Sequence, residues 1–348
     1  MELRSTEARN RANLSTGLKN RLKDALIDSR FIHMAARLVP QRIAILKYHS
    51  VQDEPERYLN SLGGGIVSST STFRKQMEIV ARKFDPVSMD DILLFLDEKK
   101  QLPRRPVVVT FDDGFADNIE IAAPILEHFG IRGAFYVTVD PVEKAGVPWF
   151  CRLRHAFGTT QKQHWADSLE GCSRDITGAS ARKAAFLIAS ERCARRRGES
   201  QEIALRTIEE ELAVEPFSDP LMMTWAQVQS LQRMGHIVGS HTVTHPNMAY
   251  LGAEDLRIEC VESKNKLEKI LGTTVLHFSY PSPILYPHWS KETVECTEKA
   301  GYRCAVTSTA GPARNDQNPL SLQRVVVPED TDEFRWVLEN TMLGRRFP

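Results

Sequence analysis

Two acidic side chains, Asp112 and Asp113, stand next to each other in the sequence, directly after the apolar run at residues 107–111 and before Gly114. A continuously apolar run of this length is typical of a strand that is buried on both faces. Two neighbouring carboxylates repel each other unless a cation or a proton lies between them. A metal ion would meet this need, with one carboxylate as a ligand and the other free as a general base. A structural alternative is a helix start, where Asp is also favoured.

Two histidines, His241 and His245, follow a second short apolar run at residues 237–238. We expect residues 241–245 to form a helical turn, because side chains four positions apart share one face of a helix. Two imidazoles that converge with one carboxylate supply three protein ligands and leave positions open for water, as a catalytic metal ion requires. A histidine pair alone is weak evidence, since each ring could be an ordinary core or surface side chain. Its place after a strand favours one site shared with the acidic pair.

A further histidine, His49, ends an apolar run that begins at Ile43. This run predicts the first strand of the fold, with His49 at its C-terminal end. An imidazole ionises near neutral pH, so it can protonate a leaving amine. The structural alternative is a capping or core histidine.

These residues need a scaffold that brings the ends of several strands together. Short apolar runs alternate with stretches of helical pattern along most of the chain. The expected strands cover residues 43–48, 107–111, 134–139, 237–240, 275–280, 305–308 and 324–327, and the expected helices cover residues 72–82, 89–98, 117–129, 224–234, 253–271, 290–300 and 329–338. About seven β/α units predict the α/β class and a distorted (β/α)7–8 TIM-like barrel, in which catalytic residues lie at the C-terminal ends of strands.

The alternation stops between about residues 149 and 220, where the chain is polar, rich in Arg, Glu and Ala, and without a strand-like run. We predict a helical insertion here. Loops that follow barrel strands tolerate insertions and surround the active site. The insertion therefore either shapes substrate access or forms a structural flap or partner surface. The predicted organisation is an N-terminal helical extension over residues 1–40 and a barrel over residues 41–348.

The charge balance argues against nucleic acid as a partner. Lys plus Arg number 45 and Asp plus Glu number 45, so the formal net charge is zero, whereas nucleic-acid binding proteins usually carry a basic excess. The six cysteines form no CxxC pair, which favours free thiols and a reducing compartment.

The N-terminal segment bears on localisation. The first 20 residues contain no apolar core of a signal peptide, and no apolar stretch in the chain is long enough to span a membrane. We therefore expect a cytoplasmic protein. Residues 17–39 mix apolar and basic side chains. They fit a helix packed on its own domain, which we favour, or an amphipathic helix in peripheral contact with a membrane.

The two motifs resemble those of a known family. Residues 110–114 read TFDDG and residues 241–245 read HTVTH, and in this order they resemble the first two motifs of the polysaccharide deacetylases, or carbohydrate esterase family 4. The resemblance covers residues 43–327, interrupted by the insertion. It implies a distorted barrel, a glycan substrate from which N-acetyl or sometimes O-acetyl groups are removed, and a zinc or similar divalent ion. It also implies that Asp112 is the general base and that the metal ligands are Asp113, His241 and His245.

Two later motifs depart from the family pattern. Residues 278–282 read FSYPS and lack the usual arginine, although the proline is kept and the backbone N–H of Ser282 could donate to an oxyanion. Arg324 stands where the family usually has a histidine as general acid. We therefore predict that His49 is the acid. We also predict that Arg324 pairs with Asp112 and keeps it ionised, the alternative being an ordinary structural ion pair.

The sequence thus predicts metal-assisted hydrolysis of an acetyl group on an oligosaccharide, a polysaccharide or a lipid-linked sugar. Residues 48–50 and 72–77 also resemble the subgroup that acts on extracellular or lipid-linked polysaccharides. Two alternatives stay open. One is a glycan-binding or scaffold protein of the same fold without turnover. The other is a non-haem iron oxygenase, since two histidines and a carboxylate also form that iron site; the second carboxylate favours the hydrolase.

Overall fold

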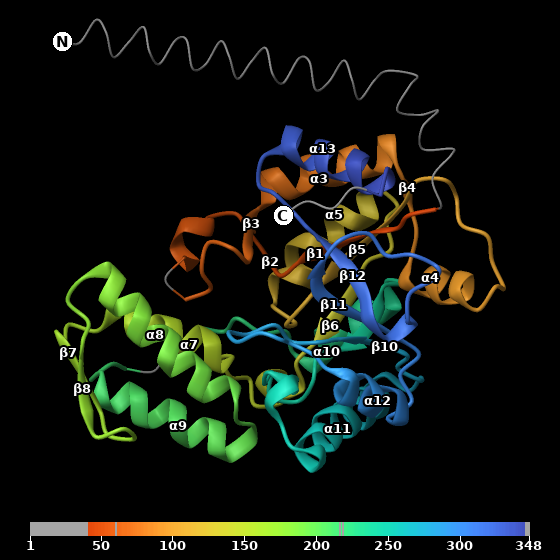
Figure 1. Cartoon of the computed structure of the whole chain (residues 1–348). Helices are drawn as coiled ribbons and strands as arrows, with labels where there is room; N and C mark the ends of the chain where they lie inside the picture. Colours follow the sequence, from red (N-terminus) through yellow and green to blue (C-terminus); the bar gives the residue numbers. More distant parts are fainter. Residues whose placement is uncertain (1–40, 60, 216, 218, 345–348) are drawn as a thin grey trace, which may run out of the picture.

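The computed structural model describes residues 41–59, 61–215, 217 and 219–344, so the predicted N-terminal extension and residues 17–39 lie outside the described part. Parallel strands at the centre form a closed barrel (Figure 1). Around the barrel they are β1 (Ala44–Tyr48), β12 (Leu322–Val326), β11 (Cys304–Ala310), β10 (His277–Ser279), β9 (Ile237–Ser240), β6 (Ala134–Val137) and β5 (Pro106–Phe111). Because β1 pairs with both β12 and β5, the sheet closes. The predicted distorted (β/α) barrel is confirmed.

Helices surround the strands, as Figure 1 shows for α3 and α13 above the barrel and for α11 and α12 below it. Their bounds are α3 (Thr70–Lys83), α4 (Met89–Leu96), the π-helical turn η2 (Asn118–Ala122), α5 (Ala123–His128), α6 (Val139–Glu143), α10 (Trp225–Arg233), η3 (Met248–Tyr250), α11 (Ala253–Leu271), α12 (Lys291–Lys299), η4 (Pro319–Ser321) and α13 (Thr331–Met342). Three of them begin with a capping box, at Ser88, Thr224 and Ser290. In a capping box the side chain satisfies backbone N–H groups that the first helical turn leaves unpaired.

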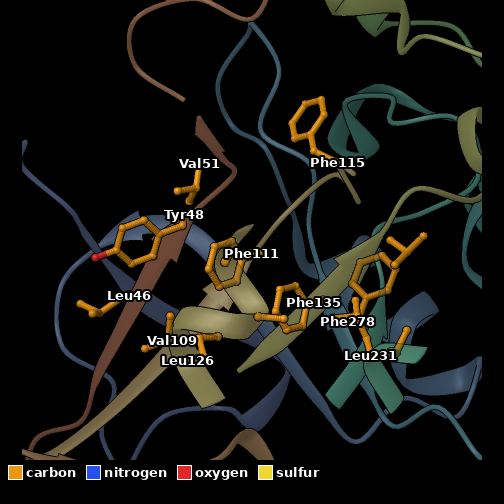
Figure 2. Packing of buried hydrophobic residues seen from close by; sticks show 14 of the residues in the cluster. Leu46, Tyr48, Val51, Val109, Phe111, Phe115, Leu126, Phe135, Leu231 and Phe278 are labelled. Carbon is orange, nitrogen blue, oxygen red and sulfur yellow. The ribbon is translucent and has the colours of Figure 1, made fainter. Parts of the chain in front are cut away.

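The hydrophobic core has two layers, which explains why the strands read as continuous apolar runs. Odd-numbered residues of β5 such as Val109 and Phe111 belong to the layer under the helices, whereas Val108 belongs to a smaller cluster inside the barrel. In the outer layer the Phe111 ring stacks on that of Phe135, with 4.8 Å between centroids (Figure 2). Successive strand residues point to opposite faces. The same alternation therefore directs Asp112, two positions after Thr110, toward the interior of the barrel.

The insertion forms a lobe beside the barrel (Figure 1). It contains α7 (Trp149–Thr159), α8 (Ala179–Ala194) and α9 (Gly198–Glu211), and its own hydrophobic cluster includes Trp165 and Ile208. The three helices agree with the predicted helical insertion. The expectation that it contains no strand is wrong, because β7 (His164–Asp167) and β8 (Cys172–Asp175) form an antiparallel hairpin. Apart from Trp165, the hairpin carries no large apolar side chain, so its sequence has no pattern typical of a strand.

Three further short strands were not predicted from the sequence. β2 (Ser50–Gln52) and β3 (Val67–Ser69) pair with each other beyond the end of β1, and the 3-10 turn η1 (Pro55–Tyr58) lies between them. β4 (Asp85–Pro86) pairs only with the beginning of β5. Segments of two or three residues are too short to show a period in the sequence.

The six cysteines lie in the described residues and all are free thiols, as predicted. Within the same part of the chain, every helix is too short or too polar to span a membrane.

Candidate active site

A sharp bend after β5 brings both acidic side chains to one place. Asp113 has φ 76° and Gly114 has φ 91°. A Cβ atom on Gly114 would lie 3.3 Å from Cγ1 of Val137, so both the backbone conformation and the close approach of β6 favour glycine. Asp112 thus keeps the inward direction of the strand, and the bend at Asp113 and Gly114 lets the Asp113 side chain reach the same site.

Asp112 is buried in a network of charged and polar groups. Arg324, on β12, donates from its two terminal nitrogens to the two carboxylate oxygens at 2.8 and 2.6 Å. Ser279 donates to Asp112 Oδ1 at 3.0 Å, and Arg324 Nε donates to the carbonyl of Thr307 at 2.9 Å. Burial alone would raise the pKa of Asp112, but the charge and hydrogen bonds of Arg324 together with the nearby histidines outweigh it and hold that pKa well below its usual range. The pairing is the one expected from the sequence, while the roles of both residues in catalysis stay predictions.

Asp113 converges with the two histidines of the second motif. Its Oδ1 lies 3.4 Å from Nε2 of His241 and 3.3 Å from Nε2 of His245, and all three side chains are buried. This Oδ1 accepts no hydrogen bond within the described residues. Donors on a tetrahedral ion with bonds of about 2.0–2.2 Å are separated by roughly 3.3–3.6 Å. A buried, unsatisfied carboxylate oxygen at these distances from two imidazoles fits a divalent metal ion.

The tautomer of His241 also suits a metal ligand. Its Nδ1 lies 2.7 Å from the carbonyl oxygen of Ser279. Because a carbonyl can only accept, Nδ1 carries the proton and Nε2 presents a lone pair toward Asp113.

The loop that carries the histidines is not the helical turn that we expected. Thr242 and His245 have positive φ values of 70° and 58°, and the segment has no helical hydrogen bonding. Glu259, on α11, instead accepts hydrogen bonds from the backbone N–H groups of Val243 and Thr244 at 2.7 and 3.0 Å. The prediction failed because non-glycine residues in the left-handed region leave no mark in the sequence.

Two further side chains on the first strand face the same interior. Lys47 and His49 share the inward side with Ile45. His49 Nε2 lies 4.0 Å from Oδ2 of Asp112, and burial lowers the pKa of His49 to about 4. Burial, together with the charge of Arg324, lowers the pKa of Lys47 to about 8. Lys47 was not among the site residues predicted from the sequence.

These groups open into a cavity of about 370 Å³. The barrel contributes Lys47, His49, Asp113, His241 and His245, the loop before β3 contributes Leu62, Gly65 and Ile66, the insertion contributes Trp149, Phe150, Arg154, Phe186, Leu187 and Ser190, and the segment after β10 contributes Ser282, Pro283 and Ile284. The Ser282 N–H donates no hydrogen bond within the described residues, so it is free to bind a ligand.

The insertion is also joined to the loop that carries His241 and His245. Trp149 Nε1 donates to the carbonyl of His245 at 3.0 Å, and the Phe150 ring packs on the His245 ring with 4.6 Å between centroids. Arg197 pairs with Glu259 at 2.8 Å. The insertion therefore forms a wall of the cavity and supports one side of the site.

The sequence profile of a family described as polysaccharide deacetylase matches residues 99–305, which is more than half of the 348-residue chain. The chain belongs to the polysaccharide deacetylase family. The matched region includes the acidic pair after β5, the insertion and both histidines, whereas Arg324 lies beyond its end.

Individual polysaccharide deacetylases are similar over most of the chain. YxkH of Bacillus subtilis (strain 168), which is provisionally named a polysaccharide deacetylase, is 20% identical over 289 residues, 83% of this chain and 72% of its own length. The structure of the Streptococcus pyogenes deacetylase PplD in complex with acetate has a TM-score of 0.59 at 18% identity, over 87% of this chain and 99% of that one. The structure of IcaB from Ammonifex degensii has a TM-score of 0.55 at 17% identity, over 86% of this chain and 97% of that one. These structures show a shared fold.

Three residues of this polysaccharide deacetylase site were missed in the sequence. Lys47 interrupts an apolar strand, and that interruption was a usable signal, since a charge inside a buried strand needs a partner or a ligand. Glu259 gave no such signal, because its helix α11 is rich in charged residues. Arg154 gave none because nothing in the sequence distinguishes it from Arg152 on the same helix.

Proposed function

We propose that this protein is a metal-dependent hydrolase that removes N-acetyl, or alternatively O-acetyl, groups from the sugars of a glycan or of a lipid-linked saccharide. The observation that carries the proposal is that Asp113, His241 and His245 converge beside a second carboxylate, that of Asp112. Asp112 forms no hydrogen bond with these three side chains and is held by Arg324 instead. An oxygenase would have no use for this second carboxylate.

Asp113, His241 and His245 are the residues that would hold the ion. When bound, a divalent ion such as zinc supplies Lewis-acid chemistry, polarising the acetyl carbonyl and lowering the pKa of a water molecule. Asp112 then accepts a proton from the attacking water. Arg324 and Ser279 keep this carboxylate ionised and fixed in position, which is the state that a general base needs.

The leaving amine must receive a proton, and His49 is best placed to deliver it. Because burial lowers its pKa to about 4, His49 is neutral at pH 7 and needs a proton during turnover. The nearest carboxylate oxygen is Oδ2 of Asp112, at 4.0 Å. We therefore assign a relay in which the proton that Asp112 takes from the attacking water crosses this gap through one bridging water to His49, and His49 gives a proton to the nitrogen as the C–N bond breaks.

The tetrahedral intermediate carries a developing negative charge on the former carbonyl oxygen. The free backbone N–H of Ser282 borders the same cavity as the three ligands and is the donor that we assign to this oxygen. A single oxyanion donor contributes about 10²–10³ in rate in other hydrolases.

Acetate release from a panel of substrates tests the proposal. The panel contains N-acetylated oligosaccharides, O-acetylated oligosaccharides and lipid-linked acetylated sugars, and mass spectrometry detects the acetate and the deacetylated sugar. We expect turnover that disappears after chelation and returns with zinc. Full metal content without release from any substrate would instead support a glycan-binding or scaffold protein. Iron content with oxygen-dependent products would support an oxygenase.

A further inference from the structure

Arg154, on α7, presents an unused guanidinium to the cavity. It forms no ion pair and no hydrogen bond within the described residues, and its Nε is buried without a partner. Its guanidinium carbon lies 5.0 Å from the centroid of the Phe186 ring. Leaving a buried cationic donor unsatisfied is unfavourable, so this position suits a ligand with an acceptor oxygen, and the charge of the guanidinium favours an anionic one.

The other arginines of the insertion show that this is exceptional. Each of them is bound to a carboxylate or to a backbone carbonyl within the described residues: Arg152, Arg174, Arg182, Arg192, Arg195, Arg196, Arg197 and Arg206. Arg152 lies two positions from Arg154 on the same helix and binds both Glu202 and Glu209. Every other arginine of the insertion thus has a carboxylate or a backbone carbonyl as its partner within the described residues, and Arg154 has neither.

The surroundings hold Arg154 in place without neutralising it. Gly63, at φ 90°, passes so close that a Cβ atom there would lie 2.9 Å from the guanidinium carbon. Phe186 packs on one side of the guanidinium, and apolar side chains such as Ile66 line the cavity nearby. A guanidinium fixed by packing loses little further freedom when it binds a ligand.

The charges that line the cavity also favour an anion. The lining contains two basic side chains, Lys47 and Arg154, and a single carboxylate, that of Asp113. The nearby charge of Asp112 is neutralised by Arg324. The lining therefore has an excess of positive charge before any metal ion is counted. A concave site of one sign attracts ligands of the opposite sign.

We propose that Arg154 forms a subsite for an anionic group, a carboxylate or a phosphate, carried by the acetylated substrate. The proposal rests on the deacetylase function above and specifies its substrate class: an acidic saccharide. A uronic acid next to the acetylated sugar would supply the carboxylate, and a sugar phosphate, including one linked to a lipid, would supply the phosphate. Phe186 would stack on the sugar ring or its neighbour beside the ion pair.

Binding and turnover of three acetylated probes test the subsite. Tetra-N-acetylchitotetraose is neutral, a hyaluronan tetrasaccharide carries carboxylates, and N-acetylglucosamine 1-phosphate carries a phosphate. Calorimetry on the zinc-loaded protein should give at least about tenfold tighter binding of one anionic probe than of the neutral one. This preference should shrink between 50 and 500 mM salt. The two anionic probes distinguish the carboxylate from the phosphate source.

The variants Arg154→Gln and Arg154→Lys locate the effect. We expect Arg154→Gln to remove the preference by raising KM for the anionic probe with little change in kcat, and Arg154→Lys to keep part of it. Arg206→Gln, on the exposed face of α9, is the matched loss of one charge and should keep the preference. Equal binding of all probes by the native protein, or an unchanged preference in Arg154→Gln, would overturn the subsite. Arg154-dependent binding without release of acetate from any probe would leave the subsite standing and count against the deacetylase function.

Discussion

The barrel and the insertion each bury an arginine–aspartate pair with two parallel hydrogen bonds. In the barrel Arg324 holds Asp112 at 2.8 and 2.6 Å, and in the insertion Arg192 holds Asp167 at 2.8 and 2.9 Å. The pairs are alike in geometry and burial, but their neighbours differ. Beside Asp112 lie an unsatisfied carboxylate oxygen and His49, whereas Asp167 receives a further arginine, Arg174. A buried ion pair therefore becomes a candidate for catalysis only through what surrounds it.

The same contrast holds for possible metal ligands. Asp167, Glu170 and Cys172 also bring three ligand atoms within 4.8 Å of one another. Both carboxylates of this group, however, are already paired with Arg174 and Arg192. A cation would have to displace these arginines, so we assign the metal to the barrel group alone.

The largest expected effect follows from removing the two histidine ligands. The double variant His241→Ala and His245→Ala should lose the single bound metal ion, and turnover should fall to background, because one carboxylate cannot hold the ion. Elemental analysis of purified protein measures this. The matched double variant in the insertion, Glu170→Gln and Cys172→Ser, should keep both metal and turnover. Unchanged metal content in the histidine variant would refute the assignment.

Next in size is the comparison of the two aspartates. Asp112→Asn should keep the metal and lower kcat by about 10²–10⁴-fold, because the amide cannot accept the water proton. Asp167→Asn should change turnover by less than about tenfold. Asp112→Asn leaves the buried Arg324 without its counter-ion and should destabilise the protein by about 3–5 kcal/mol. Asp167→Asn should destabilise it less, because Arg192 and Arg174 keep Glu170 as a counter-ion. Denaturant unfolding checks the stability and initial rates check the turnover; native-like rates in Asp112→Asn would exclude it as the base.

The success of prediction differs between these regions for a physical reason. In the barrel, strand alternation and the position of a motif at a strand end fix where a side chain points, so the seven strands and the groups Asp112, Asp113, His241 and His245 could be placed from the sequence. In the insertion, contacts such as Arg192 with Asp167 join residues from different elements, and no short pattern encodes them. The conformation of the barrel loop 241–245 was predicted wrongly for a related reason, because Glu259, on a helix further along the chain, holds the loop by hydrogen bonds.

A smaller effect is expected for His49. His49→Ala should retain the metal and lower kcat by about 10²-fold with little change in KM, because the lost proton transfer acts only in the transition state. His128→Ala, at the C-terminal end of α5 on the outside of the barrel, is the control and should behave like the native protein. Steady-state kinetics with the best substrate of the panel measures both. A native kcat in His49→Ala would remove it from the proton relay.

The smallest expected effect is on the free energy of unfolding, which should depend on pH through different groups in the barrel and in the insertion. His236, buried at the N-terminal end of β9, accepts the N–H of Gly133 on Nδ1 and has no partner on Nε2 within the described residues. Burial and the charge of Arg132 lower its pKa to about 4, against about 6.5 in the unfolded chain. The unfolded state thus binds a proton more readily. The stability that neutral His236 contributes is fully present above about pH 6.5 and is lost as the pH falls toward 4.

The aspartate of the insertion titrates in another window. Burial would raise the pKa of Asp167, but its hydrogen bonds with Arg192 and Arg174 lower it below the usual value, so its contribution is present above about pH 4 and is lost only below that. Between pH 6.5 and 4 the free energy of unfolding should therefore fall by roughly 1–3 kcal/mol less in His236→Gln than in the native protein. Glutamine can still accept the Gly133 N–H but does not titrate. Asp167→Asn should keep the native slope in this window and flatten the curve only below about pH 4. Urea unfolding at half-unit pH steps measures both curves, and equal slopes for His236→Gln and the native protein between pH 6.5 and 4 would contradict the assignment of that window to His236.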